Sequence, residues 1–350
     1  MSREPKVDRV KFQTDLGTYF RDSPDSRFLV FDGALHLEEP ERYGMYTDVS
    51  GIDTLVVKVG TAVITHKAWN RTVYNVENIS KDLARLRRER GLNVLLVTSG
   101  AIGLGRKERL RGERIYERDK NTPQQKQLDA IRGQPKLFDL WRHYFQFRSQ
   151  QQIGEKLVTH DDIRDPQRSQ RLLEQYQEWM SRGVIPVINE DDKRSLEEID
   201  ILLKGKRVFR DNDGLASLHA QFLKRIGYNP LLILLSNTDG IYTEESIRKG
   251  EYIPIRIVKD STGLEKQALP ISSTRGRGGI ISKIEAARDA TAIGVGIVVA
   301  NGQFCNHDAP YQERRKGSQR RYDVLDSVLD GRVVGTRFLP RNYVAREMPR

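Results

Sequence analysis

The sequence predicts an α/β fold: a three-layer αβα sandwich with a mainly parallel central sheet. Short, almost continuously apolar segments alternate with longer ones in which apolar residues recur at helical spacing. Polar clusters directly follow several apolar segments, which is typical of open parallel sheets, because these bind ligands beyond the carboxyl ends of their strands. With 350 residues, the chain can bury a sizeable core, as one large domain or two smaller ones.

A buried strand is predicted between Asp53 and Thr61, since four of the six residues from Leu55 to Gly60 are apolar and three of these are valine. Lys58 lies inside this apolar run. Its burial is costly unless its ammonium group emerges at the end of the strand and meets an anion. Gly60 then lets the backbone pass close to whatever Lys58 binds. A lysine on an exposed edge strand is the alternative, and the segment alone supports both interpretations equally.

The rest of the chain continues the alternation of helix and strand. Val76, Ile79, Leu83 and Leu86 share one face of a predicted helix, which Gly91 ends. Helices are predicted at residues 72–90, 124–132, 135–147, 167–181 and 279–293 and after Asp211, and strands at residues 94–97, 153–159, 184–188, 231–235 and 295–299. We divide the chain into an N-terminal extension (1–50) with a short strand at 27–31, a main domain (51–340) and a C-terminal tail (341–350).

The composition favours a folded protein in a reducing cytoplasm. Cys305 is the single cysteine, which excludes an internal disulfide framework and a cysteine zinc cluster. No apolar run reaches the roughly 20 residues that a membrane span requires, and no signal peptide follows Met1. We therefore expect a cytoplasmic location and no contact with a membrane.

The net charge of +11 has two interpretations, a nucleic-acid surface or solvated helix faces that also attract anionic substrates. Basic residues gather at 85–90, 106–114 and 314–321. No zinc finger, RNA-binding fingerprint or aromatic-interleaved basic motif accompanies them, so the second interpretation is favoured.

Four clusters carry candidate chemistry. Gly278 and Gly279 precede a predicted helix, whose first N–H groups and dipole favour an anion, and Lys283 lies about one turn inside it. Neither a Walker A motif nor Gly-x-Gly-x-x-Gly is present. The second cluster is 211–213, where helix capping needs only one of the three polar residues. The third is the polar run 189–192, which follows an apolar strand. The fourth is the small-residue turn 98–101, which leaves room for a carboxylate or phosphate.

In their order along the chain, these motifs resemble the amino acid kinase family and, within it, most closely the glutamate 5-kinase branch. The resemblance covers residues 53–340 and lacks the C-terminal PUA domain of many bacterial members. The motifs are Val57-Lys58-Val59-Gly60-Thr61, Val97-Thr98-Ser99-Gly100-Ala101, Val187-Ile188-Asn189-Glu190-Asp191-Asp192, Asp211-Asn212-Asp213, Asp239-Gly240-Ile241-Tyr242-Thr243 and Gly278-Gly279-Ile280-Ile281-Ser282-Lys283.

The resemblance implies ATP-dependent phosphorylation of the γ-carboxylate of L-glutamate, the first step of proline biosynthesis. It implies that Lys58 and Lys283 act on the phosphates from opposite sides, that Asp213 holds both ammonium groups, and that Mg²⁺ is held mainly by ATP and water. It further implies a homo-oligomer, a dimer or tetramer, and a glutamyl phosphate reductase partner. Implied cofactor-binding residues are Lys58, Gly60, Ser236, Asn237, Gly278, Gly279 and Lys283, and implied substrate-binding residues are Ser99, Gly100, Ala101, Asp192 and Asn212.

Several residues depart from the family pattern. Ser236-Asn237 replaces Thr-Asp, the third residue of the Asn-Glu-Asn-Asp motif is Asp191, and the loop from 192 to 211 is longer than usual. Arg210 replaces a glycine and Arg277 a threonine. These changes surround the site and bear on the choice of acid, nucleotide and proline feedback. The alternatives are therefore a kinase for another small acid and a catalytically impaired relative with a regulatory or nucleic-acid-binding role.

Overall fold

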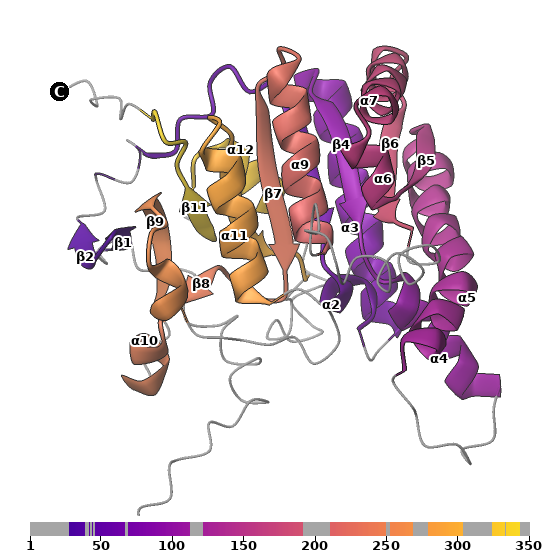
Figure 1. Cartoon of the computed structure of the whole chain (residues 1–350), viewed down its shortest axis with the longest axis horizontal. Helices are drawn as coiled ribbons and strands as arrows, with labels where there is room; N and C mark the ends of the chain where they lie inside the picture. The colour runs from indigo at the N-terminus through magenta and orange to yellow at the C-terminus, as the bar shows by residue number, and fades with distance from the viewer. Residues whose placement is uncertain are drawn as a thin grey trace, which may run out of the picture.

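The computed structural model describes residues 28–38, 42, 44, 46–66, 69–112, 122–191, 211–249, 253–268, 279–303, 324–332 and 334–343. In this part of the chain an 11-stranded sheet forms the middle layer, and helices cover both of its faces (Figure 1). The order of the strands is β2-β1-β9-β11-β10-β7-β3-β4-β6-β5, with β8 paired to β9. The three-layer αβα sandwich predicted from the sequence is confirmed.

The strands are β1 (Phe28–Asp32), β2 (Leu35–Glu38), β3 (Thr54–Val59), β4 (Asn93–Thr98), β5 (Ile153–Val158), β6 (Ile185–Glu190), β7 (Pro230–Ser236), β8 (Ile241–Tyr242), β9 (Pro254–Asp260), β10 (Gly296–Asn301) and β11 (Thr336–Phe338). The helices are α2 (Thr61–Ile64), α3 (Trp69–Arg90), α4 (Ala101–Gly112), α5 (Pro123–Arg142), α6 (His160–Arg164), α7 (Pro166–Ser181), α9 (Asn212–Arg225), α10 (Glu244–Lys249), α11 (Ile280–Thr291) and α12 (Val324–Leu329). None of these described helices is long and apolar enough to cross a membrane.

The strands that matter for the site lie side by side and parallel. β3 pairs with β4 and β7, β4 also pairs with β6, and β7 also pairs with β10, all in parallel. Antiparallel pairs occur only between β1 and β2, β8 and β9, and β10 and β11 among the described strands. The carboxyl ends of these five strands therefore meet at one edge of the sheet, at the bottom of Figure 1.

β3 is a central strand, so the alternative that Lys58 lies on an exposed edge strand is wrong. All six residues of β3 are buried, Lys58 included. Alternate residues of a strand face opposite sides of the sheet. Leu55, Val57 and Val59 pack in the core that includes α3, whereas Val56 packs in the core that includes α9 and α11. Lys58 has the same parity as Val56 and therefore faces α9 and α11.

The two helices predicted at 124–132 and 135–147 form one helix, α5, followed by a π-helical turn (His143–Arg148), so this prediction is wrong. Pro135 lies inside α5, where it donates no hydrogen bond to the preceding turn. Packing compensates for this loss. A Cβ on Gly133 would lie 1.8 Å from the carbonyl oxygen of Ala101, so α5 touches α4 backbone to backbone. Buried Leu137 and Trp141 hold the helix beyond Pro135 in the core.

The described part of the N-terminal extension adds to the sheet. The strand predicted at 27–31 is confirmed as β1, which pairs in parallel with β9, and β2 folds back on it. Glu38 at the end of β2 is 6% exposed and accepts hydrogen bonds from Lys259 and Tyr46, both at 2.8 Å. Burial raises the pKa of Glu38, but hydrogen bonds with Lys259, Tyr46 and His36 outweigh it and lower that pKa to about 2, so the carboxylate stays ionised.

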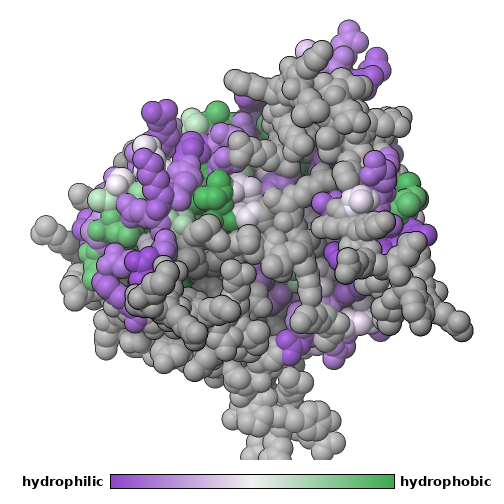
Figure 2. All heavy atoms as spheres, turned by 60° about the horizontal axis from the view of Figure 1, so that its bottom comes forward, coloured by the Kyte–Doolittle hydropathy of each residue, from purple (hydrophilic) through white to green (hydrophobic). Residues whose placement is uncertain are grey.

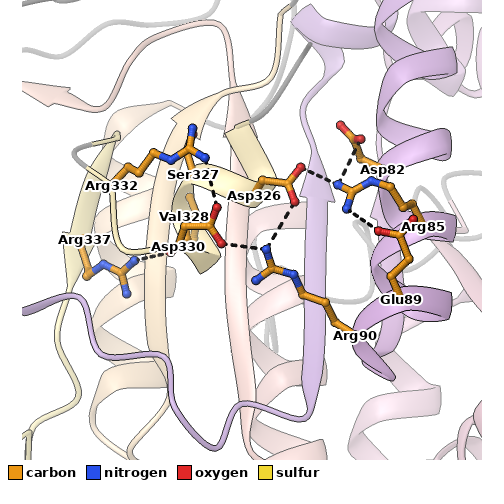
Figure 3. Close-up of polar contacts among 10 residues, drawn as sticks. All are labelled: Asp82, Arg85, Glu89, Arg90, Asp326, Ser327, Val328, Asp330, Arg332 and Arg337. Carbon is orange, nitrogen blue, oxygen red and sulfur yellow. Dashed lines mark hydrogen bonds and ion pairs between the residues drawn. The ribbon is translucent and has the colours of Figure 1, made fainter.

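One predicted arginine cluster is an internal ion-pair network that joins α3 to α12 (Figure 3). Arg85 pairs with Asp326 and, on its own helix, with Asp82 and Glu89. Arg90 contacts Asp330 at 2.7 Å and Asp326 at 3.6 Å. The side chains of Arg85 and Asp326 are each 13% exposed, so this pair is only weakly screened by solvent.

We expect Asp326→Ala to lower the free energy of unfolding by about 2 kcal/mol, because it leaves Arg85 largely buried without its main acceptor. Asp330→Ala serves as the control, since that carboxylate is 35% exposed and its loss should cost less than about 1 kcal/mol. Urea denaturation monitored by circular dichroism measures both changes. Equal losses for the two variants would contradict the structural role given to Asp326.

A second prediction concerns His219, which is buried between α7 and α9. Its Nδ1 lies 2.8 Å from the carbonyl oxygen of Leu215 and its Nε2 3.1 Å from the hydroxyl of Tyr176. Burial lowers the pKa of His219 to about 4, below the roughly 6.5 of an unfolded chain. In this window the unfolded state binds a proton that the folded state does not. The free energy of unfolding therefore decreases by up to about 3 kcal/mol as the pH falls from about 6.5 to about 4.

His219→Gln, which cannot take up this proton, should flatten the dependence of unfolding free energy on pH in that window. Denaturation curves at pH 4.5, 5.5, 6.5 and 7.5 measure the slope for both proteins. Identical slopes would show that His219 is not the group that titrates.

Candidate active site

Three predicted residues from distant parts of the chain meet at the carboxyl edge of the sheet. The Nζ of Lys58 lies 2.6 Å from Oδ1 of Asp213, and the Nζ of Lys283 lies 2.7 Å from Oδ2. Asp213 is fully buried, and the two lysines are 6% and 8% exposed. One carboxylate thus bridges two ammonium groups that come from β3 and α11.

Local sequence explains how each group reaches this point. The side chain of Asp211 caps α9 by accepting from the N–H groups of Asp213 and Gly214 at 2.9 and 3.2 Å, which fixes Asp213 in the first turn. α11 begins after Gly279 and carries Lys283 in its first turn. The hydroxyl of Ser217 donates to the carbonyl oxygen of Ala286 at 2.7 Å and links α9 to α11.

Electrostatics keep the bridge ionised. Burial raises the pKa of Asp213, but Lys283 and Lys58 together outweigh it and hold that pKa well below its usual range. The hydroxyl of Ser282 donates a further hydrogen bond to Oδ2 at 3.2 Å. Two cations and one anion leave a net charge of +1 among these three side chains. A carboxylate with so low a pKa is a poor proton acceptor, so the arrangement suits the binding of an anion better than base catalysis.

The turns next to Lys58 bring backbone close to the same place. The N–H of Gly60 donates to the carbonyl oxygen of Leu235 at 2.9 Å, and a Cβ on Gly60 would lie 3.1 Å from that oxygen and 3.8 Å from the Nζ of Lys58. The N–H of Ser99 donates to the carbonyl oxygen of Val59 at 3.1 Å. Gly100 has a φ of +113°, which strongly favours glycine. Ser99, Gly100 and Ala101 therefore lead from the end of β4 into α4, beside the end of β3.

Three amide side chains, from the end of β6, the middle of α5 and the start of α9, meet one another. The Nδ2 of Asn212 donates to Oδ1 of Asn189 at 3.1 Å, and the Nδ2 of Asn189 donates to Oε1 of Gln134 at 2.7 Å. Asn212 and Asn189 belong to predicted motifs, whereas sequence reasoning missed Gln134. The available signal was weak: a polar residue on the apolar face of a helix, directly before a proline.

The remaining predicted residues are placed only in part. Ser236 is the last residue of β7 and Asn237 follows it, and both are half-buried. The carbonyl oxygen of Ser236 accepts from the N–H of Gly302 at 2.7 Å. Asp191 follows β6, and its N–H donates to the carbonyl oxygen of Val158 at 2.9 Å. Asp192, Arg210, Arg277 and Gly278 lie outside the described residues.

The described side chains on this side of the molecule are mostly polar. In Figure 2, which turns the lower edge of Figure 1 forward, hydrophilic residues predominate where side chains are described, and hydrophobic residues form small separate groups. Among the described residues no group of three or more His, Cys, Asp or Glu side chains could hold a metal ion. At this edge of the sheet, the two ammonium groups that share Asp213 suit the binding of an anion.

Comparison with known proteins decides the family. The model of the amino acid kinase family matches residues 53–301. The chain belongs to this family. It is 30% identical to the glutamate 5-kinase of Clostridium acetobutylicum over 295 residues, which are 84% of this chain and 97% of that protein. It is 33% identical to the glutamate 5-kinase of Caldanaerobacter subterraneus subsp. tengcongensis over 82% of this chain and 68% of that protein.

A solved structure supports the fold alone. The N-acetylglutamate synthase of Neisseria gonorrhoeae, in complex with coenzyme A and L-arginine, superposes with a TM-score of 0.50 at 12% identity. The superposition covers 82% of this chain and 61% of the synthase. This family member thus shares the sandwich architecture with a protein of very different sequence.

The charge arrangement of the site generates a prediction about stability. Asp213→Asn should lower the free energy of unfolding by about 2–4 kcal/mol, because Lys58 and Lys283 then face each other without their shared carboxylate. Lys58→Met added to Asp213→Asn should restore part of this loss, since it removes one of the two repelling cations. Urea denaturation of wild type, Asp213→Asn, Lys58→Met and the double variant at pH 7 measures the coupling. Strictly additive losses would contradict the bridge.

Proposed function

We propose that this amino acid kinase family member transfers the γ-phosphoryl group of ATP to the γ-carboxylate of L-glutamate, giving an acyl phosphate, with residues 51–340 as the kinase domain. The observation that carries the proposal is the carboxylate of Asp213 held between Lys58 and Lys283. The relatives named glutamate 5-kinase support the choice of acid.

The chemistry of this reaction matches the groups present. A carboxylate substrate is already an anionic nucleophile at neutral pH, so the reaction needs no strong general base. Its main obstacles are repulsion between two anions and the charge that develops on the transferring group, which positioned cations relieve. Asp213 has the wrong pKa for a base but holds both cations in place.

Each residue takes one role in this proposal. Lys58, beside Gly60, would hold the β- and γ-phosphates, and Lys283 would stabilise the charge on the leaving group. ATP would supply the phosphoryl group, and Mg²⁺, which would be held mainly by ATP and water, would neutralise negative charge on the phosphates. Gly278 and Gly279 would contact phosphates at the start of α11, and Ser236 and Asn237 would contact the nucleotide.

The acid would bind on the other side of Asp213. Ser99, Gly100 and Ala101 offer small side chains and backbone amides, and Asn212 offers an amide close to Asp213. Asp192 would pair with the ammonium group of the amino acid. Another small acid is the second candidate, favoured by Asp191 and Arg277, which change the charge around the proposed site.

Several expectations from the sequence stay predictions. The acyl phosphate product is labile, so an enzyme that reduces it is an expected partner. Three further expectations also stay predictions: a cytoplasmic location, assembly into a dimer or tetramer, and feedback inhibition by proline. The two buried lysines that share Asp213 argue against the catalytically impaired alternative. Their burial is costly, and neither helix capping nor packing requires it.

We expect purified protein with L-glutamate, ATP, Mg²⁺ and hydroxylamine to form γ-glutamyl hydroxamate. Lys283→Ala should lower the rate by at least about 100-fold, because a preorganised positive charge is lost at the leaving group. Lys266→Ala is the control, as this lysine lies in a 3₁₀ turn (Leu264–Lys266) outside the site. The same assay is run with a panel of small acids. If another acid forms a hydroxamate and glutamate does not, that acid, and not glutamate, is the substrate.

A further inference from the structure

The amide chain beside the site has a fixed direction. The backbone N–H of Glu190 can only donate, and it donates to Oδ1 of Asn212 at 3.4 Å. The Nδ2 of Asn212 must therefore be the donor to Asn189, and the Nδ2 of Asn189 the donor to Gln134. Each amide is oriented by the one before it. The last member is Gln134, whose side-chain oxygen accepts the hydrogen bond from Asn189, so that its NH₂ group is left to donate.

This terminal NH₂ group is a buried donor without an acceptor. Gln134 is 5% exposed, and its Nε2 makes no hydrogen bond in the structure. An unsatisfied buried donor typically costs about 1–3 kcal/mol. Buried polar side chains nearly always find a partner, so such an atom beside a candidate active site indicates a group that arrives with a ligand.

Gln134 lies next to the predicted acid-binding turn. Gly133, its neighbour in α5, touches the carbonyl oxygen of Ala101 at the start of α4. α4 has 12 residues and follows Ser99 and Gly100, so its first N–H groups and the Nε2 of Gln134 are donors in the same region. The N–H groups of α4 and the NH₂ group of Gln134 can both donate hydrogen bonds to an anion that binds beside this turn. They do not fit the ammonium group of an amino acid, which is itself a donor.

We propose that Gln134 is a substrate-binding residue whose NH₂ group donates to the carboxylate that is not phosphorylated. This inference rests on the proposed function, because it assumes an acid with two carboxylates. The reacting carboxylate must lie at Lys58 and Lys283, whereas Gln134 is separated from Asp213 by Asn212 and Asn189. The α-carboxylate of glutamate is the anion left for it.

Gln134→Glu is the variant that tests this role most sharply. It keeps an oxygen for Asn189 and nearly the same shape, and it replaces only the donor. At pH 8 the KM for glutamate should rise about 10- to 100-fold, with the KM for ATP unchanged, because an acceptor now faces the substrate carboxylate. Burial raises the pKa of a carboxyl group, and the protonated form can donate, so the defect should shrink toward pH 6. A residue with a purely structural role would not give this pH profile.

Two further measurements complete the experiment. Gln134→Met, which has neither a donor nor a repelling carboxylate, should also raise the KM, by less than Gln134→Glu at pH 8 and without the pH-dependent recovery. It replaces Gln134→Glu if that variant does not fold. Inhibition by 4-aminobutanoate, which lacks the α-carboxylate, should be equal in wild type and both variants. Gln124→Glu, an exposed position on the same helix, is the matched control and should behave as wild type.

The outcomes separate the two proposals. Wild-type protein that forms no hydroxamate with glutamate contradicts the proposed function itself. Active wild type together with variants whose KM for glutamate is unchanged, or whose kcat alone falls, overturns the role of Gln134 and leaves the function standing.

Discussion

The site depends on one shared carboxylate. Asp213 is fully buried, and it is ionised only because Lys58 and Lys283 lie on either side of it. Removing either cation would leave a buried charge only half compensated. β3, α9 and α11 must therefore keep their relative positions to within the length of a hydrogen bond. The same triad carries more positive than negative charge, so the interaction that fixes these elements also attracts an anion.

Much of this arrangement follows from simple periodicities in the sequence. The apolar runs predicted the central strands, and helical spacing predicted α3 with its buried Val76, Ile79, Leu83 and Leu86. The alternation of β3 would also have placed Lys58 on the face of Val56. What the sequence could not supply was the neighbour of each strand. The sequence left open whether Lys58 lies on a central strand or on an edge strand. β3 is central because it pairs with both β4 and β7, which are distant from it in sequence.

The errors have a common physical cause. Pro135 is a local signal that ends most helices, and α5 continues through it because Gly133 and Gly105 let α4 and α5 pack backbone to backbone. The importance of Gln134 was missed for the same reason, since the direction of its amide is set by residues from β6 and α9. Properties that arise between elements cannot be read from any one of them.

Charge illustrates this limit further. In the sequence, Arg85 and Arg90 are indistinguishable from a basic surface that binds nucleic acid. In the structure they satisfy Asp326 and Asp330 and hold α12 against α3 (Figure 3). Lys58 and Lys283 are two single lysines far apart in the sequence, yet both are buried and share one carboxylate. Charges that outnumber their partners in a buried place attract a ligand more strongly than an equal excess in solvent, because the low dielectric there strengthens every interaction. The useful positive charge of this protein is therefore found by counting partners among buried groups rather than by counting arginines.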